Sequence, residues 1–135
     1  MVVVSKEDGL TFGLGGLLAF LISTGWYAAF GSGLLEKAFW FYAVNAFIVG
    51  GVVVFLFHVA SRLRRLQRRN RVLAAAIFAA PGLIGAGIML ALFKDIFPGW
   101  DPASLGRYAA FILVGEALLA SVALDRTKRA ASRAR

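Results

Sequence analysis

The sequence predicts an all-α integral membrane protein: a bundle of four transmembrane helices joined by short loops. Three observations predict this class. Of the 135 residues, 60% are hydrophobic and only 16% are charged, whereas soluble domains carry roughly 25% charged residues. The charged residues are clustered, which leaves long uncharged runs. Most of the basic residues fall on one side of a four-helix threading, together with both termini.

The uncharged runs are long enough to cross a bilayer. Residues 9–35, 38–60 and 72–93 contain no charged side chain, and about 20 apolar residues span the roughly 30 Å hydrocarbon core as a helix. A fourth run, 108–124, is shorter and contains Glu116. We therefore expect one domain, residues 1–128, with spans at about 9–31, 38–60, 72–94 and 104–125. A basic tail, 129–135, follows, and the chain beyond Asp125 is expected to continue the fourth helix.

Each span is expected to be a helix, because backbone groups in hydrocarbon must pair within the protein. The first has a capping-box signal in Ser5 and Asp8. The fourth is preceded by Asp101 and Pro102, a favourable N-cap and N1 pair. Pro81 lies midway along the third span and removes one helical hydrogen bond, so we expect a kink or hinge there. Short loops predict that helices adjacent in sequence pack as antiparallel neighbours.

The distribution of basic residues predicts the orientation. Twelve of the fifteen lie on one side of the threading: Lys6, six arginines in the loop 61–71 and five residues in the C-terminal tail. The positive-inside rule places both termini and this loop in the cytoplasm, in a membrane of the bacterial plasma or inner type. The tryptophans and tyrosines fall at the opposite ends of the spans, where an aromatic belt is expected. They are Trp26, Trp40, Trp100, Tyr27, Tyr42 and Tyr108.

The arginine loop is the first candidate binding segment. Each basic side chain near an anionic surface contributes about 1 kcal/mol, so we expect contact with anionic lipid headgroups or a partner. The candidates are Arg62, Arg64, Arg65, Arg68, Arg69 and Arg71. The net charge of +8 is explained by membrane topology, and no nucleic-acid binding is expected.

Glu116 is the second candidate, because an ionisable residue near the middle of a span is costly and marks a functional site by default. Helical spacing groups it with Leu113 and Ala120 on a face expected to point into the bundle, and sets Phe111 on the opposite, lipid-facing side. Polar residues at similar depth are Ser23, Thr24 and Asn45. With Glu116 they form a candidate ion- or substrate-binding group, although each can instead serve as a structural hydrogen bond.

Small residues four apart mark candidate helix contacts, since they let helix backbones approach closely. The pairs are Gly9 and Gly13, Gly15 and Ala19, Gly25 and Ala29, and Ala46 and Gly50.

Enzymatic chemistry is not expected. The chain has no cysteine and one histidine, His58, near the end of the second span. It therefore lacks a metal-ligand set and a second haem ligand, and no cofactor is expected. Glu116 has no second carboxyl at its depth for acid–base work.

Two functions remain. Small size, few polar intramembrane residues and minimal outer loops slightly favour a non-catalytic accessory or assembly subunit that packs against larger membrane proteins. The alternative is a small homo-oligomeric transporter or channel that uses Glu116 for proton or cation coupling.

Overall fold

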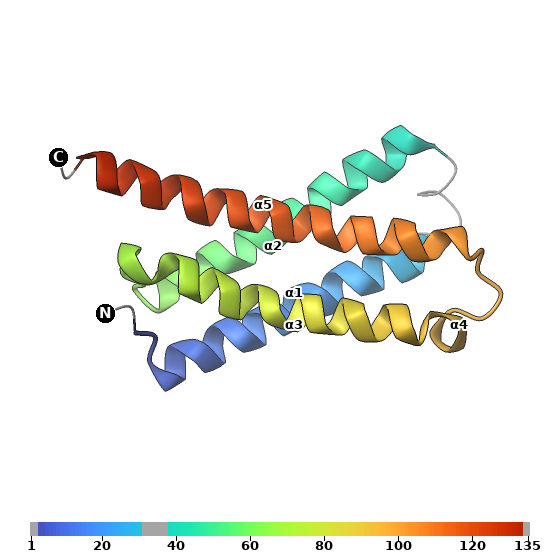
Figure 1. Cartoon of the computed structure of the whole chain (residues 1–135), viewed down its shortest axis with the longest axis horizontal. Coiled ribbons are helices and arrows are strands. Elements are labelled where there is room, and N and C mark those ends of the chain that lie inside the picture. Colours follow the sequence, from blue (N-terminus) through green and yellow to red (C-terminus); the bar gives the residue numbers. More distant parts are fainter. Residues whose placement is uncertain (1–2, 31–37, 134–135) are drawn as a thin grey trace.

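The computed structural model describes residues 3–30 and 38–133, apart from the side chains of 126–131, and every regular element in this part is helical (Figure 1). The elements are α1 (Lys6–Phe30), α2 (Phe39–Leu63), η2 (Arg68–Asn70), α3 (Arg71–Ala91), α4 (Phe93–Ile96) and α5 (Ala103–Arg133). Within these residues, four helices are long and apolar enough to cross a membrane. The prediction of an all-α chain with four such helices is therefore confirmed.

The helix ends follow the local signals. Ser5 Oγ accepts a hydrogen bond from the Asp8 N–H at 3.1 Å, and Asp101 Oδ1 accepts one from the Ala103 N–H at 2.9 Å. Pro81 lies inside α3, which is helical on both sides of it. α5 extends to Arg133, so the chain beyond Asp125 does continue the fourth helix. The first connection, 31–37, lies outside the described residues.

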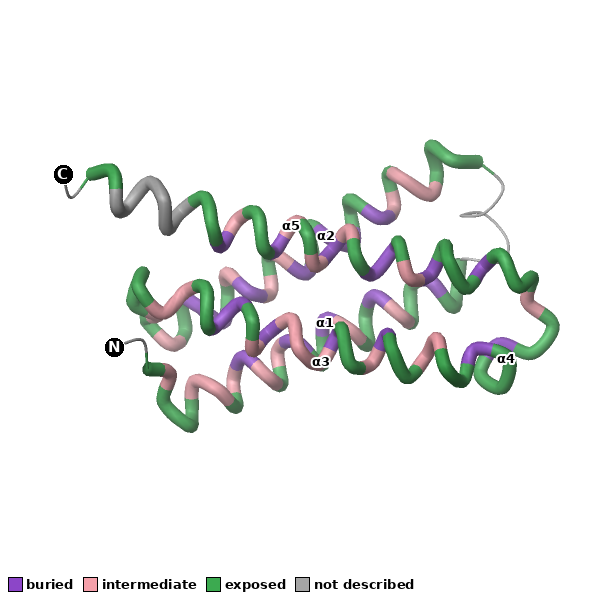
Figure 2. The backbone as a smooth tube through the Cα atoms, in the orientation of Figure 1, coloured by how far each residue is buried: buried purple, intermediate pink, exposed green. Residues whose placement is uncertain are grey.

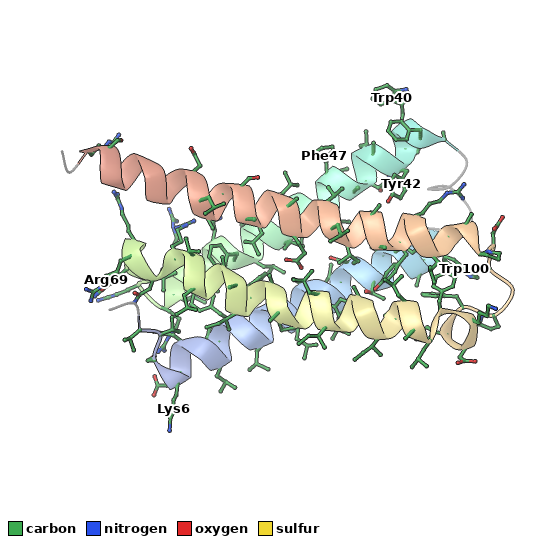
Figure 3. All side chains as sticks on the ribbon, viewed as in Figure 1. Lys6, Trp40, Tyr42, Phe47, Arg69 and Trp100 are labelled. Carbon is green, nitrogen blue, oxygen red and sulfur yellow. The ribbon has the colours of Figure 1, made fainter. Side chains whose placement is uncertain are left out.

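Most basic side chains and the tryptophans lie at opposite ends of the bundle. Figure 3 shows Lys6 and Arg69 at one end, and Trp40 and Trp100 at the other. We name these the arginine end and the aromatic end. α1 starts and α5 finishes at the arginine end, where α2 also connects to α3, whereas α4 lies at the aromatic end (Figure 1).

The helix neighbours differ in part from the prediction. α1 packs mainly on α3, and α2 mainly on α5, so the most extensive contacts join helices that run in the same direction. The antiparallel pairs α3 with α5 and α1 with α2 also pack together, as expected. α2 and α3 follow each other in sequence but are not among the main packed pairs. Seven residues of loop and η2 give the chain enough length to place α3 beside α1.

Glycines set how closely the parallel helices approach. A Cβ on Gly16 of α1 would overlap the carbonyl oxygen of Phe78 in α3. A Cβ on Gly50 of α2 would lie 3.3 Å from the Cα of Gly115 in α5. By contrast, nothing lies within 4 Å of a Cβ on Gly13. Of the predicted small-residue pairs, those containing Gly15 and Gly50 therefore meet another helix, whereas Gly9, Gly13 and Gly25 face open space.

The buried positions, purple in Figure 2, lie along all the long helices. Their side chains form two clusters along the bundle axis. Towards the arginine end, Phe57 packs against Phe12 and Phe78, with ring centroids 5.7 and 5.5 Å apart. Towards the aromatic end, Tyr27 packs against Tyr108 and Phe111 at 5.3 and 5.4 Å. The two clusters leave the middle of the bundle between them, and Glu116 lies there.

Two of the tyrosines correct the prediction of an aromatic belt. Tyr27 and Tyr108 are fully buried, whereas Trp40 is 76% exposed. Burial is tolerated because each hydroxyl has a partner: Tyr27 donates to the Ser104 carbonyl at 3.3 Å, and Tyr108 shares a 2.9 Å hydrogen bond with Thr24. A tyrosine whose hydroxyl is satisfied inside the bundle contributes packing as a phenylalanine does.

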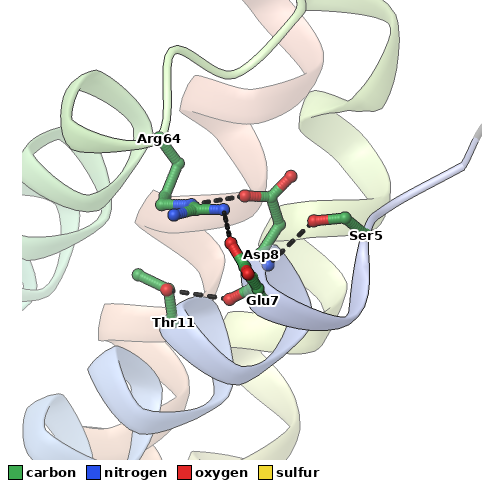
Figure 4. A network of polar contacts seen from close by, with 5 residues as sticks. All are labelled: Ser5, Glu7, Asp8, Thr11 and Arg64. Carbon is green, nitrogen blue, oxygen red and sulfur yellow. Dashed lines mark hydrogen bonds and ion pairs between the residues drawn. The ribbon is translucent and has the colours of Figure 1, made fainter.

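An ion-pair network closes the arginine end (Figure 4). Arg64, just after α2, donates from Nε to Asp8 at 2.5 Å and from a terminal nitrogen to Glu7 at 3.0 Å. Both carboxylates belong to the first turn of α1, where acidic groups are also favoured by the helix dipole. Asn70 adds a hydrogen bond to the Val3 carbonyl at 2.8 Å. The network holds the α2–α3 loop against the start of α1.

Candidate functional site

The carboxyl of Glu116 points into the bundle and lies against α3. A Cβ on Gly82 would stand 2.5 Å from Glu116 Oε1, so the absence of a side chain at position 82 makes room for the carboxyl. Oε2 is buried and has no hydrogen-bond partner among the described residues. A buried polar atom without a partner is rare and requires an explanation, such as a bound water, a proton or an ion.

A small cavity of about 10 Å³ adjoins this carboxyl at the centre of the bundle. A cavity of roughly this size holds one water molecule. All four long helices contribute to its wall, through Ala19, Ser23, Val53, Gly82, Gly115 and Glu116 among others. The site is therefore sized for a proton, a water or a small cation, and anything larger requires the helices or side chains around it to move.

Of the polar residues predicted to lie near Glu116, Ser23 and Thr24 of α1 are placed differently. Ser23 lines the same cavity as Glu116, although its hydroxyl donates to the Ala19 carbonyl of its own helix at 2.8 Å. Thr24 pairs with Tyr108 instead. The structure thus brings Ser23 to the Glu116 cavity, and Thr24 does not line it.

Asn45 also lies away from the cavity lining. Its amide nitrogen donates to the Phe41 carbonyl at 2.8 Å, and its oxygen accepts from the Trp26 indole at 3.3 Å. Both bonds tie α2 to itself and to α1. In this structure Asn45 makes an interhelical hydrogen bond with Trp26, which is the structural alternative stated for it above.

The predicted inward face of the fourth helix was wrong in detail. Phe111, assigned to lipid, is 1% exposed and lies in the core, whereas Leu113, assigned to the bundle, is 56% exposed. Gly115 packs on α2, which turns Phe111 inward and leaves Glu116 half-buried on the α3 side. The close contact between Gly115 and Gly50 of α2 sets which side of α5 faces inward, and the spacing of small residues along α5 did not predict it.

The six loop arginines divide into two groups. Arg64 is engaged with Glu7 and Asp8, which raises the pKa of its guanidinium. Arg71 donates to His58 Nε2 at 3.2 Å and stands 5.4 Å over the Phe57 ring. The other four arginines are exposed at the arginine end: Arg62, Arg65, Arg68 and Arg69. Headgroup contact is therefore a property we expect mainly of these four.

His58 supports the fold in this arrangement. Its Nδ1 lies 2.9 Å from the Val54 carbonyl, an acceptor, so Nδ1 carries the proton and Nε2 accepts from Arg71. Among the described residues, no group of three or more histidine, aspartate or glutamate side chains is arranged to hold a metal ion.

An apolar groove between α1 and α3 was missed by the sequence reasoning. Its volume is about 560 Å³, within the range of small-molecule sites. Its lining includes Leu17, Phe20, Ile77, Pro81, Ile84 and Met89. The available signal was Pro81 followed at short spacing by Gly82 and Gly85, which leaves α3 with little side-chain volume on one side.

A model of a family of unknown function, DUF5367, matches residues 34–128. The chain belongs to the DUF5367 family. The match covers Glu116, Gly82 and Pro81, whereas α1, with Ser23 and Phe20, precedes it. DUF5367 is a family of unknown function. No curated protein and no solved structure matches the chain.

Proposed function

We propose that this DUF5367 protein is a small homo-oligomeric membrane transporter in which Glu116 exchanges a proton for a cation. One observation carries the proposal: the Glu116 carboxyl is inside the bundle, with a buried oxygen that has no partner among the described residues. A carboxyl that served only as a structural hydrogen bond would have its oxygens satisfied. The single-water cavity beside it provides a place for the proton or ion to bind.

The proposed oligomer is a way to complete a pathway that the cavity alone does not form. A volume of about 10 Å³ does not form a pathway, and four helices leave little space for one. A pathway would be completed by movement of the helices around Glu116 or by a second copy. We propose no catalytic step and no cofactor for this function.

We propose that both termini and the arginine end face the cytoplasm of a bacterial-type plasma membrane. The support is the concentration of basic residues there and of tryptophans at the other end. The chain contains no cysteine, so single cysteines introduced at Arg68 and at Lys94 can be labelled without background. An impermeant reagent applied to intact cells should modify the second and not the first; the reverse pattern refutes this orientation.

Infrared spectroscopy of the full-length protein in nanodiscs tests the role of Glu116. We expect the carbonyl band of a protonated carboxyl to disappear reversibly as the pH is raised, because a carboxyl that exchanges its proton must titrate. Glu116→Gln should lack this band. A band that persists at every pH would make Glu116 a permanent hydrogen-bond donor and would exclude proton coupling.

A second candidate, the accessory subunit, is favoured by the exposed aromatic surface of α2. Phe39, Phe41, Phe47 and Phe55 are 59–73% exposed, and the first half of α2 diverges from the other helices in Figure 1. Such a surface suits a partner helix as well as lipid. Native mass spectrometry after gentle extraction separates the two: a hetero-complex of fixed stoichiometry supports the subunit, and a homo-oligomer supports the transporter.

A further inference from the structure

The α1–α3 groove and the Glu116 cavity share one wall, the side chain of Phe20. Its ring packs over α3 so closely that a Cβ on Gly85 would lie 2.6 Å from it. Gly82, one turn earlier, accommodates the Glu116 carboxyl in the same way. Gly82 and Gly85 thus make room on one side of α3 for the Glu116 carboxyl and the Phe20 ring. Phe20 lines both spaces and therefore separates the groove from the carboxyl.

The chemistry of the two spaces is complementary to one class of ligand. The groove lining is entirely apolar, and Glu116 is the ionisable group that lines the cavity behind it. No basic side chain from the described residues lines either space. Pro81 has no N–H to donate to the Ile77 carbonyl, so this oxygen lacks its usual helical donor and keeps its partial negative charge. The face of an aromatic ring such as Phe20 also attracts cations.

We propose that this groove binds a lipophilic organic cation with a single positive charge, for which Glu116 is the counter-ion. The apolar body occupies the groove, and rotation of Phe20 brings the charge to the carboxyl. The carboxyl then releases its proton to water, so that one cation exchanges for one proton and the charge balances. This inference rests on the proposed function and specifies its substrate class.

Equilibrium dialysis with radiolabelled tetraphenylphosphonium tests the proposal on the full chain in nanodiscs, after subtraction of binding to empty nanodiscs. Tetraphenylborate, which has the same shape and the opposite charge, is the ligand control. We expect the phosphonium to bind about tenfold or more tightly than the borate, a difference of about 1.4 kcal/mol. Its binding should release protons into a weakly buffered solution.

Three variants locate the site. Glu116→Gln removes the counter-ion, and Ala80→Phe fills the groove from a residue that does not line the Glu116 cavity. Both should weaken phosphonium binding by about tenfold. Ala110→Phe, the same change at an exposed position of α5, should have no effect. If Glu116→Gln does not fold, Ala80→Phe and the comparison of the two ions still decide the question.

Several results would overturn the proposal. One such result is equal binding of phosphonium and borate. Another is an unchanged phosphonium affinity in Glu116→Gln or Ala80→Phe. Either would mean that the groove binds only lipid chains. In that case a Glu116 band that titrates in the infrared would still support proton coupling, and only the substrate class would be wrong. A Glu116 band that does not titrate would remove the proposed function itself.

Discussion

Replacing Gly16 with alanine is expected to destabilise the bundle more than any other single-methyl addition to α1. The new Cβ would overlap the Phe78 carbonyl oxygen, a backbone atom that cannot turn aside. α1 and α3 must then separate, and the packing of Phe12 and Phe78 around the crossing is loosened. Overpacking of this kind costs about 1–3 kcal/mol, and sometimes more.

Gly13→Ala is the matched control, because it adds the same methyl group to the same helix, three residues earlier. Nothing lies within 4 Å of a Cβ there, and alanine is favoured over glycine in a helix by roughly 0.5–1 kcal/mol. Unfolding in mixed detergent micelles, followed by circular dichroism, gives both free energies. Equal stability of the two variants would mean that the α1–α3 crossing is not as close as described.

Replacing Gly82 with alanine is expected to change the function more than the stability. The added Cβ would stand 2.5 Å from Glu116 Oε1, the end of a flexible side chain, so the carboxyl should move rather than the helices. Once displaced from the cavity, the carboxyl meets different surroundings. We expect its infrared titration midpoint to shift by about one pH unit or more, equivalent to about 1.4 kcal/mol.

Gly87→Ala controls for helix propensity, since it lies on α3 and nothing approaches a Cβ there within 4 Å. It should leave the Glu116 titration where it is in the unmodified chain. The loss of stability in Gly82→Ala should be smaller than that in Gly16→Ala. A Glu116 band unchanged by Gly82→Ala would contradict the contact between this glycine and the carboxyl.

The sequence by itself determined the membrane-type composition, the four helices and the signals that start two of them. Uncharged runs of sufficient length specify where helices can lie in hydrocarbon, whatever their packing. Ser5 and Asp101 bond to nearby backbone N–H groups, so local sequence is enough to place them. Glu116 could be singled out for a similar reason, because its cost depends on depth along the helix and not on which neighbours it meets.

Only the tertiary structure decided which face of each helix is buried. A soluble helix marks its outer side with polar residues, but these spans have too few polar residues to mark one side. Phe111 and Leu113 are equally compatible with lipid and with the core, and the structure buries only the first. Gly13 and Gly16 are likewise the same residue on the same helix, and only the second meets α3.

The candidate site was likewise predictable only in part from the sequence. The presence of a carboxyl at mid-depth followed from the sequence, whereas its contact with Gly82, the cavity it shares with Ser23 and the Phe20 wall did not. These features depend on α1 packing beside α3, two helices that are not consecutive in the chain. The two helices pair where their backbones approach closely at glycines. Whether two surfaces fit depends on both helices, so it cannot be read from the sequence of either one alone.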